Sequence, residues 1–399
     1  MKSVGRDKER GYMRMEQRKL SEKKAFGRFT RAWSFLFLLI SLAFGTYTAY
    51  SGFVSQRYLL ILGALLLLFF LLLFPVLFSY RFKKSRKIFA FVCSLLFSAL
   101  YITASVYLAY TAGFLGTVSR PGTKSTPSDK VAAAAIVKEP FHVLISGIDS
   151  YGDIGDGRSD VNMVASVNPK TKTILLTTIP RDYYIELPHQ QGTFDKLTHT
   201  GLAGPEETKK AVENLLDLKI DYRLRVNYST LVNLVDAMGG ITVHSDYDFV
   251  TLGDEYIFQE GDNEMDGENA LAFVRERSAF TDGDLQRNRD QAYVLQAIID
   301  KLTKSPTLLL KYTAILDSLD GTMEMDFTPN QVKALVRMQM DNMDPWTICR
   351  QGLIGENSLE YSAYIGDYAS VVLQDEESIE KAKANIHRLE SGEPVEEEE

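Results

Sequence analysis

The chain has 399 residues, enough for more than one domain, and a hydrophobic share of 45% with 11% aromatics excludes an intrinsically disordered protein. Its two cysteines, Cys93 and Cys349, lie in very different segments, which excludes a disulfide framework or a cysteine metal cluster. The net charge of −8 is unevenly divided: residues 1–112 hold 17 Lys and Arg against 4 Asp and Glu, a net of +13, which leaves −21 for residues 113–399.

The N-terminal part has the composition of a membrane anchor. Residues 1–31 are polar and basic, without the apolar run of a cleaved signal, and are predicted to form a cytoplasmic tail. Three apolar segments follow, at residues 32–50, 58–80 and 88–114. Each is long enough to cross a hydrocarbon core that needs about 20 residues, so residues 32–114 are predicted to form three transmembrane helices.

The charges of the two connecting loops predict the orientation. The connection 51–57 holds one positive charge, whereas the connection 81–87 holds five. Because cytoplasmic loops are enriched in Lys and Arg, we expect the N-terminus and the second loop in the cytoplasm and the C-terminal domain outside. A hairpin that re-enters the membrane is the weaker alternative, since all three apolar segments are full length.

Residues 115–139 have turn-forming and flexible composition, including the alanine run 132–135, and predict a linker. After it, short apolar runs predict strands at 141–146, 161–167 and 173–179.

Charged residues follow these strands, at the positions where open α/β sheets commonly hold ligands. Asp149 follows the first strand, Arg158 and Asp160 belong to the Gly- and Asp-rich loop 152–160, and Arg181 follows the third strand. Two carboxylates near arginines predict a divalent cation that bridges protein and phosphate, since Mg²⁺ is often held by carboxylates plus substrate oxygens. The alternative is that the aspartates only form turns. The loop fits no Walker or Rossmann spacing, so no nucleotide site is predicted.

Helices and strands alternate in the next segment. Helices are expected at 206–216 and 229–238, strands at 222–228 and 241–245, and two later helices at 329–340 and 375–389. This alternation predicts an α/β fold. The acidic residues 391–399 are expected to form a solvated tail.

The stretch from Leu271 to Gln291 carries more chemical information than any other part of the chain. Residues 271–277 are β-type and predict a strand that places Arg275 and Arg277 on one face. After a turn signal, a helix is expected in which Asp284, Arg287 and Gln291 share a face.

The helix continues with Val294, Leu295, Ile298 and Leu302 on that same side, so the polar trio is predicted to face the interior. Arg289 and Asp290 are expected on the outer side. Converging arginines suggest a site for a multiply charged anion, because their planar forks suit phosphate or carboxylate oxygens. The alternative is that the arginines form structural ion pairs, which is the commoner case for strand arginines.

Five motifs, in this order, resemble the LytR-CpsA-Psr family of cell-wall glycopolymer transferases, found mostly in Gram-positive bacteria. They are LISGIDS at 144–150, GRSD at 157–160, IPRD at 179–182, LVDAMGGI at 234–241 and ALAFVRERSAFTDGDLQRNRDQ at 270–291. Any one motif is weak alone, but their combined order is highly specific.

The resemblance implies a catalytic domain at residues 140–390, an extracytoplasmic α/β/α sandwich around a mixed central sheet. It grips a polyprenyl pyrophosphate, with the lipid tail in an apolar pocket and Mg²⁺, or alternatively Mn²⁺, at the head group. Matched by position, the pyrophosphate-binding arginines are Arg158, Arg181, Arg275, Arg277 and Arg287. The metal-associated acids are Asp149 and Asp160, and the residues that orient the cluster are Asp284 and Gln291.

The implied reaction is phosphoryl transfer. A sugar hydroxyl of peptidoglycan attacks the phosphorus next to the glycopolymer, and polyprenyl phosphate leaves. Arginines and Mg²⁺ stabilise the charge of such a transition state, and the candidate catalytic residues are Arg275, Arg277, Asp284 and Arg287. Asp160, Asp182 or Asp284 could accept the proton, and the sequence leaves this choice open.

Two other classes of function stay open. Members of the family have been called transcriptional attenuators, but the cytoplasmic segments contain no helix-turn-helix pattern, so nucleic acid is not expected as a partner. A protein that only binds or hydrolyses polyprenyl pyrophosphate would use the same ligand. The expected partners are the lipid-linked glycopolymer, peptidoglycan and membrane lipid; the polymer itself, whether teichoic acid, capsule or another wall polysaccharide, is left open.

Overall fold

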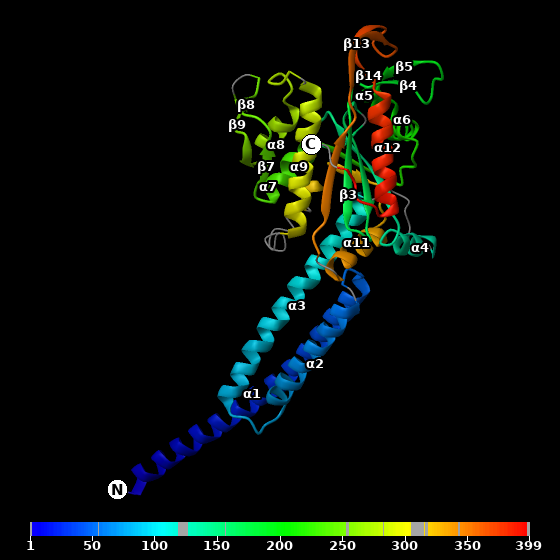
Figure 1. Cartoon of the computed structure of the whole chain (residues 1–399). Helices are drawn as coiled ribbons and strands as arrows, with labels where there is room; N and C mark the ends of the chain where they lie inside the picture. Colours follow the sequence, from blue (N-terminus) through cyan, green and yellow to red (C-terminus); the bar gives the residue numbers. More distant parts are fainter. Residues whose placement is uncertain are drawn as a thin grey trace. The chain divides into compact units, whose positions relative to one another are not determined.

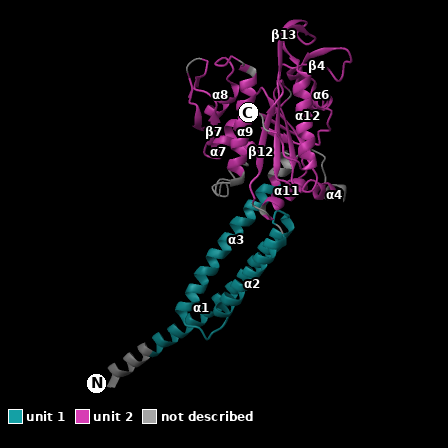
Figure 2. Ribbon diagram, in the orientation of Figure 1, with its two compact units in different colours: residues 1–112 teal, residues 113–399 magenta. Residues whose placement is uncertain are grey.

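The computed structural model of the chain divides into two compact units, residues 1–112 and 113–399 (Figure 2). It describes residues 2–54, 56–118, 127–155, 157–252, 255–281, 283–304, 315, 318–341 and 344–396. Within these segments, only the backbone is described for residues 2–12, 114–118, 127–130, 284, 303–304 and 340.

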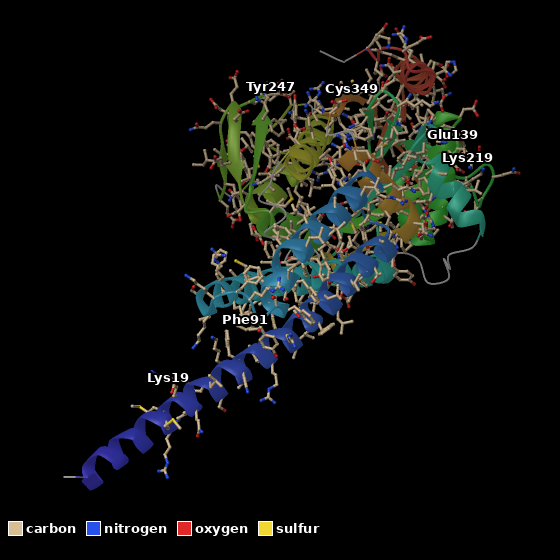
Figure 3. All side chains as sticks on the ribbon, turned by 90° about the horizontal axis from the view of Figure 1, so that it is seen from below. Lys19, Phe91, Glu139, Lys219, Tyr247 and Cys349 are labelled. Atoms are coloured by element: carbon tan, nitrogen blue, oxygen red, sulfur yellow. The ribbon has the colours of Figure 1, made fainter. Side chains whose placement is uncertain are left out.

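The first unit consists of α1 (Lys2–Ser51), α2 (Gln56–Phe78) and most of α3 (Lys84–Val118). All three helices contain a stretch that is long and apolar enough to cross a membrane, as predicted. Helix α1 runs without a break from the basic tail, where Figure 3 labels Lys19, into the first apolar segment. The Trp33 indole on α1 donates a 2.7 Å hydrogen bond to the Ser94 hydroxyl on α3, so this helix pair carries polar as well as apolar contacts.

A six-stranded mixed sheet forms the centre of the second unit, in the order β11-β6-β1-β2-β3-β12. Its strands are β1 (Phe141–Ile148), β2 (Ser159–Asn168), β3 (Thr173–Ile179), β6 (Tyr222–Asn227), β11 (Met323–Met325) and β12 (Thr347–Gly352). β1 is parallel to β6 and antiparallel to β2, and β3 is antiparallel to β2 and parallel to β12. The four strands predicted for this region are confirmed, with small shifts at their ends.

Helices cover both faces of this sheet, which confirms the α/β/α sandwich (Figure 1). On one face, α6 (Pro205–Leu216) and α12 (Glu376–Ser391) form a core with Leu175. On the other face, α9 (Gly283–Lys304) and α11 (Pro329–Asp341) form a core with Leu176. Neighbouring leucines enter different cores because successive side chains of a strand point to opposite faces.

A third core lies beside the sheet and holds much of the predicted site sequence. It is built by α7 (Tyr228–Ala237), α8 (Gly267–Arg275), part of α9, and the strands β7 (Ile241–Ser245), β8 (Phe249–Val250), β9 (Ile257–Phe258) and β10 (Gly261–Met265). Asn227 caps α7, since its side chain accepts a hydrogen bond from the Thr230 amide. Because Asn227 also ends β6, the cap sets where the strand turns into the helix.

Two hairpins complete the second unit and lie side by side in Figure 1. The first pairs β4 (Tyr184–Glu186) with β5 (Phe194–Lys196), and the second pairs β13 (Gly355–Ser362) with β14 (Asp367–Gln374). The short helix α5 (Leu197–Thr200) follows directly on β5.

The strand predicted at 271–277 is wrong, because this segment is the end of helix α8 and the turn after it. Asp266 caps the helix by accepting from the Asn269 amide, and Ala270, Leu271, Phe273 and Val274 are buried at helical spacing. The cap and the apolar stripe both begin before residue 271. The prediction considered residues 271–277 alone, and these residues are mostly β-type. Arg275 therefore ends a helix, and Arg277 does not share a strand face with it.

The predicted outer side of α9 is also partly wrong. Arg289 is exposed and Arg287 is buried, as expected, but Asp290 is fully buried and accepts a 3.0 Å hydrogen bond from the Gln286 side chain. Leu302, expected inside, is 44% exposed. Asp290 is buried because α9 packs against α8 and β7 as well as against β3 and β12, so that two of its sides are covered and a one-stripe pattern does not apply.

Part of the predicted linker is ordered structure. Residues Pro127–Ala135 form α4, and Ala133 and Ile136 are buried in the core that also contains Phe141. The prediction of a flexible linker is therefore wrong for this part. A run of alanines has the highest intrinsic helix propensity, and here it packs against an apolar surface.

Candidate functional site

The strand ends of the central sheet bring the predicted acidic residues to one edge. Ile148 at the end of β1 pairs with Asn227 at the end of β6 and with Ser159 at the start of β2. The residues that follow or border these positions, Asp149, Asp160 and Tyr228, are therefore neighbours in space although they are far apart in the sequence.

The phenol of Tyr228 lies near the two predicted metal-associated acids. Burial, together with the charges of Asp149 and Asp160 and a polar interaction with the Asp149 carboxylate, raises the pKa of Tyr228. The phenol thus stays protonated at neutral pH. Both carboxylates therefore lie within electrostatic reach of the same phenol.

Arg181 forms an ion pair with one of these acids, Asp160. Its Nη1 lies 2.9 Å from Asp160 Oδ2, and the Thr198 hydroxyl donates to the other oxygen of Asp160 at 3.1 Å. Asp182 lies beside Arg181 and forms a 3.0 Å ion pair with Lys196. A network of side chains therefore links the turn after β3 to the beginning of β2.

Arg275 reaches the same cluster from helix α8. Its guanidinium carbon lies 4.7 Å from the centroid of the Tyr228 ring, close enough for a cation–π contact. The charge of Arg275 opposes the effect of the two aspartates on the pKa of the Tyr228 phenol, so it lies within electrostatic reach of the same group. Gln291 on α9 donates a 3.3 Å hydrogen bond to the Val274 carbonyl, which ties the end of α8 to α9.

Glu276 holds the turn that carries Arg277. It is 6% exposed, and its carboxylate accepts hydrogen bonds from the amides of Leu252, Arg277, Ser278 and Ala279. Burial opposes ionisation, but these four donors outweigh it and hold the pKa of Glu276 below its usual range. Gly283 opens α9 against the same turn: a Cβ atom there would meet the Arg277 carbonyl oxygen at 2.7 Å.

The remaining predicted residues are placed as follows. Arg287 is buried in α9, whereas Arg158 and Arg277 are exposed. Asp284 belongs to α9, but its side chain lies outside the described residues. The structure therefore brings together Asp149, Asp160, Arg181 and Arg275, and joins Gln291 to them through the backbone of α8.

Sequence reasoning missed Tyr228, Thr198, Lys196 and Glu276. Tyr228 was assigned to the end of a strand, although Asn227 followed by Thr230 three positions later is a helix-capping signal that would have placed it at the start of α7. His199, next to Thr198, bonds the buried Asp195 at 2.7 Å. Long-range pairs such as Thr198 with Asp160 leave no signal in one sequence.

The carboxylates near the site are compatible with an Mg²⁺ ion whose other ligands are oxygens of a bound substrate. The described residues contain no group of three or more His, Cys, Asp and Glu side chains that could hold a metal by themselves. The pair Asp149 and Asp160 supplies two hard oxygen ligands at most, and Mg²⁺ in phosphoryl-transfer sites commonly uses one or two carboxylates plus phosphate oxygens and water. The residues present are thus compatible with the predicted cation when a pyrophosphate completes its shell.

A cavity of about 310 Å³ opens between α9 and the ends of β3 and β12. Leu285, Ala292 and Leu353 give it apolar walls, but Asp246, Arg289 and Arg350 also line it. This mixed lining is not a wholly apolar pocket, so the position of a lipid tail stays a prediction.

Comparisons with known proteins agree with this architecture. A model of the LytR_cpsA_psr family matches residues 114–381. The polyisoprenyl-teichoic acid–peptidoglycan teichoic acid transferase TagU of Halalkalibacterium halodurans is 36% identical over 229 residues, which cover 57% of this chain and 73% of that protein. The crystal structure of B. subtilis TagV matches with a TM-score of 0.51 at 27% identity, covering 64% of this chain and 99% of that one. A structure of TagT bound to LIIa-WTA matches with a TM-score of 0.51 at 26% identity, covering 64% and 92%.

Proposed function

Because the chain belongs to the LytR_cpsA_psr family, we propose that it is a membrane-anchored phosphotransferase that moves a glycopolymer from a polyprenyl-pyrophosphate carrier to a sugar hydroxyl of peptidoglycan. The observation that carries the proposal is the cluster at the sheet edge, where Arg181 pairs with Asp160, Arg275 lies over the Tyr228 ring, and Asp149 and Asp160 lie near the Tyr228 phenol. Such a mixture of hard oxygens and guanidinium groups suits a metal-bound pyrophosphate.

The proposed polymer is a teichoic acid. TagU of H. halodurans is named a teichoic acid transferase, and the TagT structure was obtained with LIIa-WTA bound. Both are similar to this chain over most of their own length, which supports the same class of donor here.

The chemistry is a substitution at phosphorus. The oxygen of the acceptor sugar forms a bond to the phosphorus that carries the glycopolymer, and the bond from that phosphorus to the bridging oxygen of the pyrophosphate breaks. Polyprenyl phosphate leaves with the electron pair of the broken bond, and the acceptor proton passes to a base, for which Asp160, Asp182 and Asp284 are the candidates. Arg181 and Arg275, with Arg158, Arg277 and Arg287, would stabilise negative charge on the phosphoryl oxygens, which is the main contribution a protein makes to such a transition state.

The proposal includes Mg²⁺, or Mn²⁺ in its place, held by Asp149 and Asp160. When bound, the cation supplies Lewis-acid stabilisation of the pyrophosphate oxygens. Tyr228, which stays protonated, would lie beside these carboxylates without adding a negative charge.

We also propose that the N-terminus is cytoplasmic and that the catalytic domain lies outside. The loop charges at 51–57 and 81–87 support this orientation. It places the domain where peptidoglycan is found.

The test is a transfer assay with the full chain in detergent micelles, a short-chain polyprenyl-pyrophosphate-linked teichoic acid precursor and peptidoglycan. The measured quantity is polymer phosphate that stays covalently attached to peptidoglycan after denaturing washes, and we expect it to depend on the protein. Release of polymer without attachment would identify a pyrophosphatase instead. Binding of the precursor without any product would identify a carrier-binding protein.

A further inference from the structure

The two hairpins of the second unit expose an unusual number of aromatic and large aliphatic side chains. We name this set the hairpin surface: Phe194 of β5 and Leu359, Tyr361, Tyr364, Ile365 and Tyr368 of the β13–β14 hairpin, with exposures between 42% and 64%. An apolar patch of this kind on a protein surface generally marks an interaction site.

The rings of this surface are arranged by strand register. Tyr361 and Tyr368 are directly opposite each other on β13 and β14, and their rings meet edge to face with centroids 6.2 Å apart. Tyr184 of β4 donates a 2.9 Å hydrogen bond to the Tyr361 carbonyl, and its ring lies 5.5 Å from that of Phe194. Tyr184 therefore links the aromatic side chains of the first hairpin to those of the second.

The charge around these rings is negative. Residues 355–374 contain Glu356, Glu360 and Asp367 and no Lys or Arg. A polyanion such as a teichoic acid, or a membrane rich in anionic lipid, would be repelled by these carboxylates. A polysaccharide backbone rich in hydroxyl and amide groups would not be repelled, since its ring C–H faces stack on tyrosine and its hydroxyls donate hydrogen bonds to carboxylates.

The hairpin surface is held rigidly from below by Asp195. This side chain is 1% exposed, and it accepts hydrogen bonds from the Ser362 hydroxyl at 2.8 Å and from the Tyr364 amide at 2.7 Å. The same carboxylate bonds His199 at 2.7 Å. Because these contacts connect the tip of β13–β14 to the end of β5, little conformational entropy remains to be lost when a ligand binds.

A chain of contacts also connects the two hairpins to the proposed catalytic site. Lys196, next to Asp195, pairs with Asp182, and Asp182 adjoins Arg181, which contacts Asp160. In addition, the Val372 amide of β14 donates to the Asp182 carbonyl at 2.8 Å. The turn that presents Arg181 to the pyrophosphate thus also supports the hairpin.

We propose that the hairpin surface binds the glycan strand of the acceptor, the peptidoglycan polysaccharide, and holds it beside the site of phosphoryl transfer. The proposal rests on the proposed function for the identity of the acceptor. It adds that the hairpin surface binds the acceptor glycan and not the donor polymer. This choice follows from the exposed tyrosines and from the absence of Lys and Arg in residues 355–374.

The experiment is co-sedimentation of the full chain in detergent micelles with peptidoglycan sacculi stripped of teichoic acid. The double variant Tyr361→Ala/Tyr368→Ala should bind sacculi about tenfold more weakly than the wild type, since exposed aromatic anchors dominate such interfaces. The variant Tyr361→Phe/Tyr368→Phe keeps both rings and should bind within about twofold of the wild type. Tyr247→Ala is the matched control, because Tyr247 is 51% exposed like Tyr361 but lies outside both hairpins (Figure 3).

Parallel measurements separate this proposal from the proposed function. Binding of a short-chain prenyl pyrophosphate with Mg²⁺ should be unchanged in the Tyr361/Tyr368 double alanine variant and lost in Arg275→Ala. If Arg275→Ala binds the pyrophosphate normally, the proposed function fails, whatever the hairpin does. If the double variant binds sacculi as the wild type does, or loses binding to poly(glycerol phosphate) or neutral lipid vesicles instead, the acceptor surface is overturned while the pyrophosphate site stands.

Discussion

Tyr228 shows how single residues at the sheet edge act together. Its ring contacts the Arg275 guanidinium, and its hydroxyl lies within electrostatic reach of the Asp149 and Asp160 carboxylates. One side chain is thereby close to a proposed anion-binding group and to a proposed cation-binding group. Preorganisation of this kind reduces the reorganisation needed when charge develops in the transition state.

Arg275→Ala is expected to lower the rate of glycopolymer transfer by about ten- to a hundredfold, because it removes a charge-assisted contact worth about 1.5–3 kcal/mol. Arg275→Lys should restore little, since an ammonium lacks the planar fork that meets two oxygens. The control is Arg388→Ala. Arg388 lies on α12, away from the core that contains α8, and pairs with Glu396. Equal losses in the two alanine variants would show an effect of net charge and contradict the site.

Asp149→Asn and Asp160→Asn are each expected to raise the Mg²⁺ concentration needed for pyrophosphate binding by about tenfold, equivalent to about 1.4 kcal/mol, because each replaces a charged hard ligand by a neutral one. Calorimetric titration of prenyl pyrophosphate at a series of Mg²⁺ concentrations measures this. Asp153→Asn, an exposed acid of the same loop, should leave the Mg²⁺ dependence unchanged. If all three variants keep the wild-type dependence, the aspartates serve only as turn residues.

At the scale of elements, the site depends on the connection between α8 and α9. Glu276 ends α8 in extended geometry and collects the amides of the next three residues, while Gly283 permits α9 to begin against the Arg277 carbonyl. Gln291 then bonds α9 back to α8. The orientation of Arg275 and Arg277 is therefore set by a turn whose stability depends on one buried carboxylate.

Glu276→Gln is expected to make this turn open more easily, by about 2 kcal/mol at neutral pH, because charge-assisted hydrogen bonds are weakened. The pKa of Glu276 is held below its usual range, so its stabilisation is fully present above the unfolded-state pKa of about 4.3 and is lost as the pH falls through the lower folded-state pKa. Amide hydrogen exchange at Arg277 and Ser278 measures the opening free energy. The difference between wild type and variant should be constant above about pH 5 and shrink below pH ~4; a difference that grows on acidification would contradict the assignment.

At the scale of the whole molecule, charge and hydropathy divide the chain into an apolar and basic N-terminal part and an acidic C-terminal part. Residues 1–112 have a net charge of +13 and residues 113–399 a net charge of −21. A positive N-terminal part and second loop favour retention on the cytoplasmic side, and an acidic domain is compatible with the outer face.

Single cysteines test this topology in a background where Cys93 and Cys349 are changed to Ser. A cysteine at Val54 or Lys138 should react with a membrane-impermeant thiol reagent on intact cells, and a cysteine at Lys83 should react only after the cells are opened, because its loop carries the positive charges that stay inside. Reversed labelling would discard the orientation.

The sequence by itself determined the features that depend on local pattern. The three spans, the strands β1, β2 and β3, and the positions of Asp149, Asp160 and Arg181 at strand ends follow from hydropathy, alternation and turn residues. These signals are readable because each is complete within a short window of the chain. The sandwich architecture came from the resemblance, and the structure confirms it.

Tertiary structure decided the rest, because it depends on which segments meet. The buried Asp290 follows from α9 being covered on two sides, and Arg275 became a helix end because the cap at Asp266 and the apolar stripe of α8 outweigh the β-type residues after Leu271. The pairing of Tyr228 with Asp149, and the hairpin surface held by Asp195, join residues from separate elements. Contacts of this range arise from strand register and helix packing, and the physical information for them is spread over the whole chain.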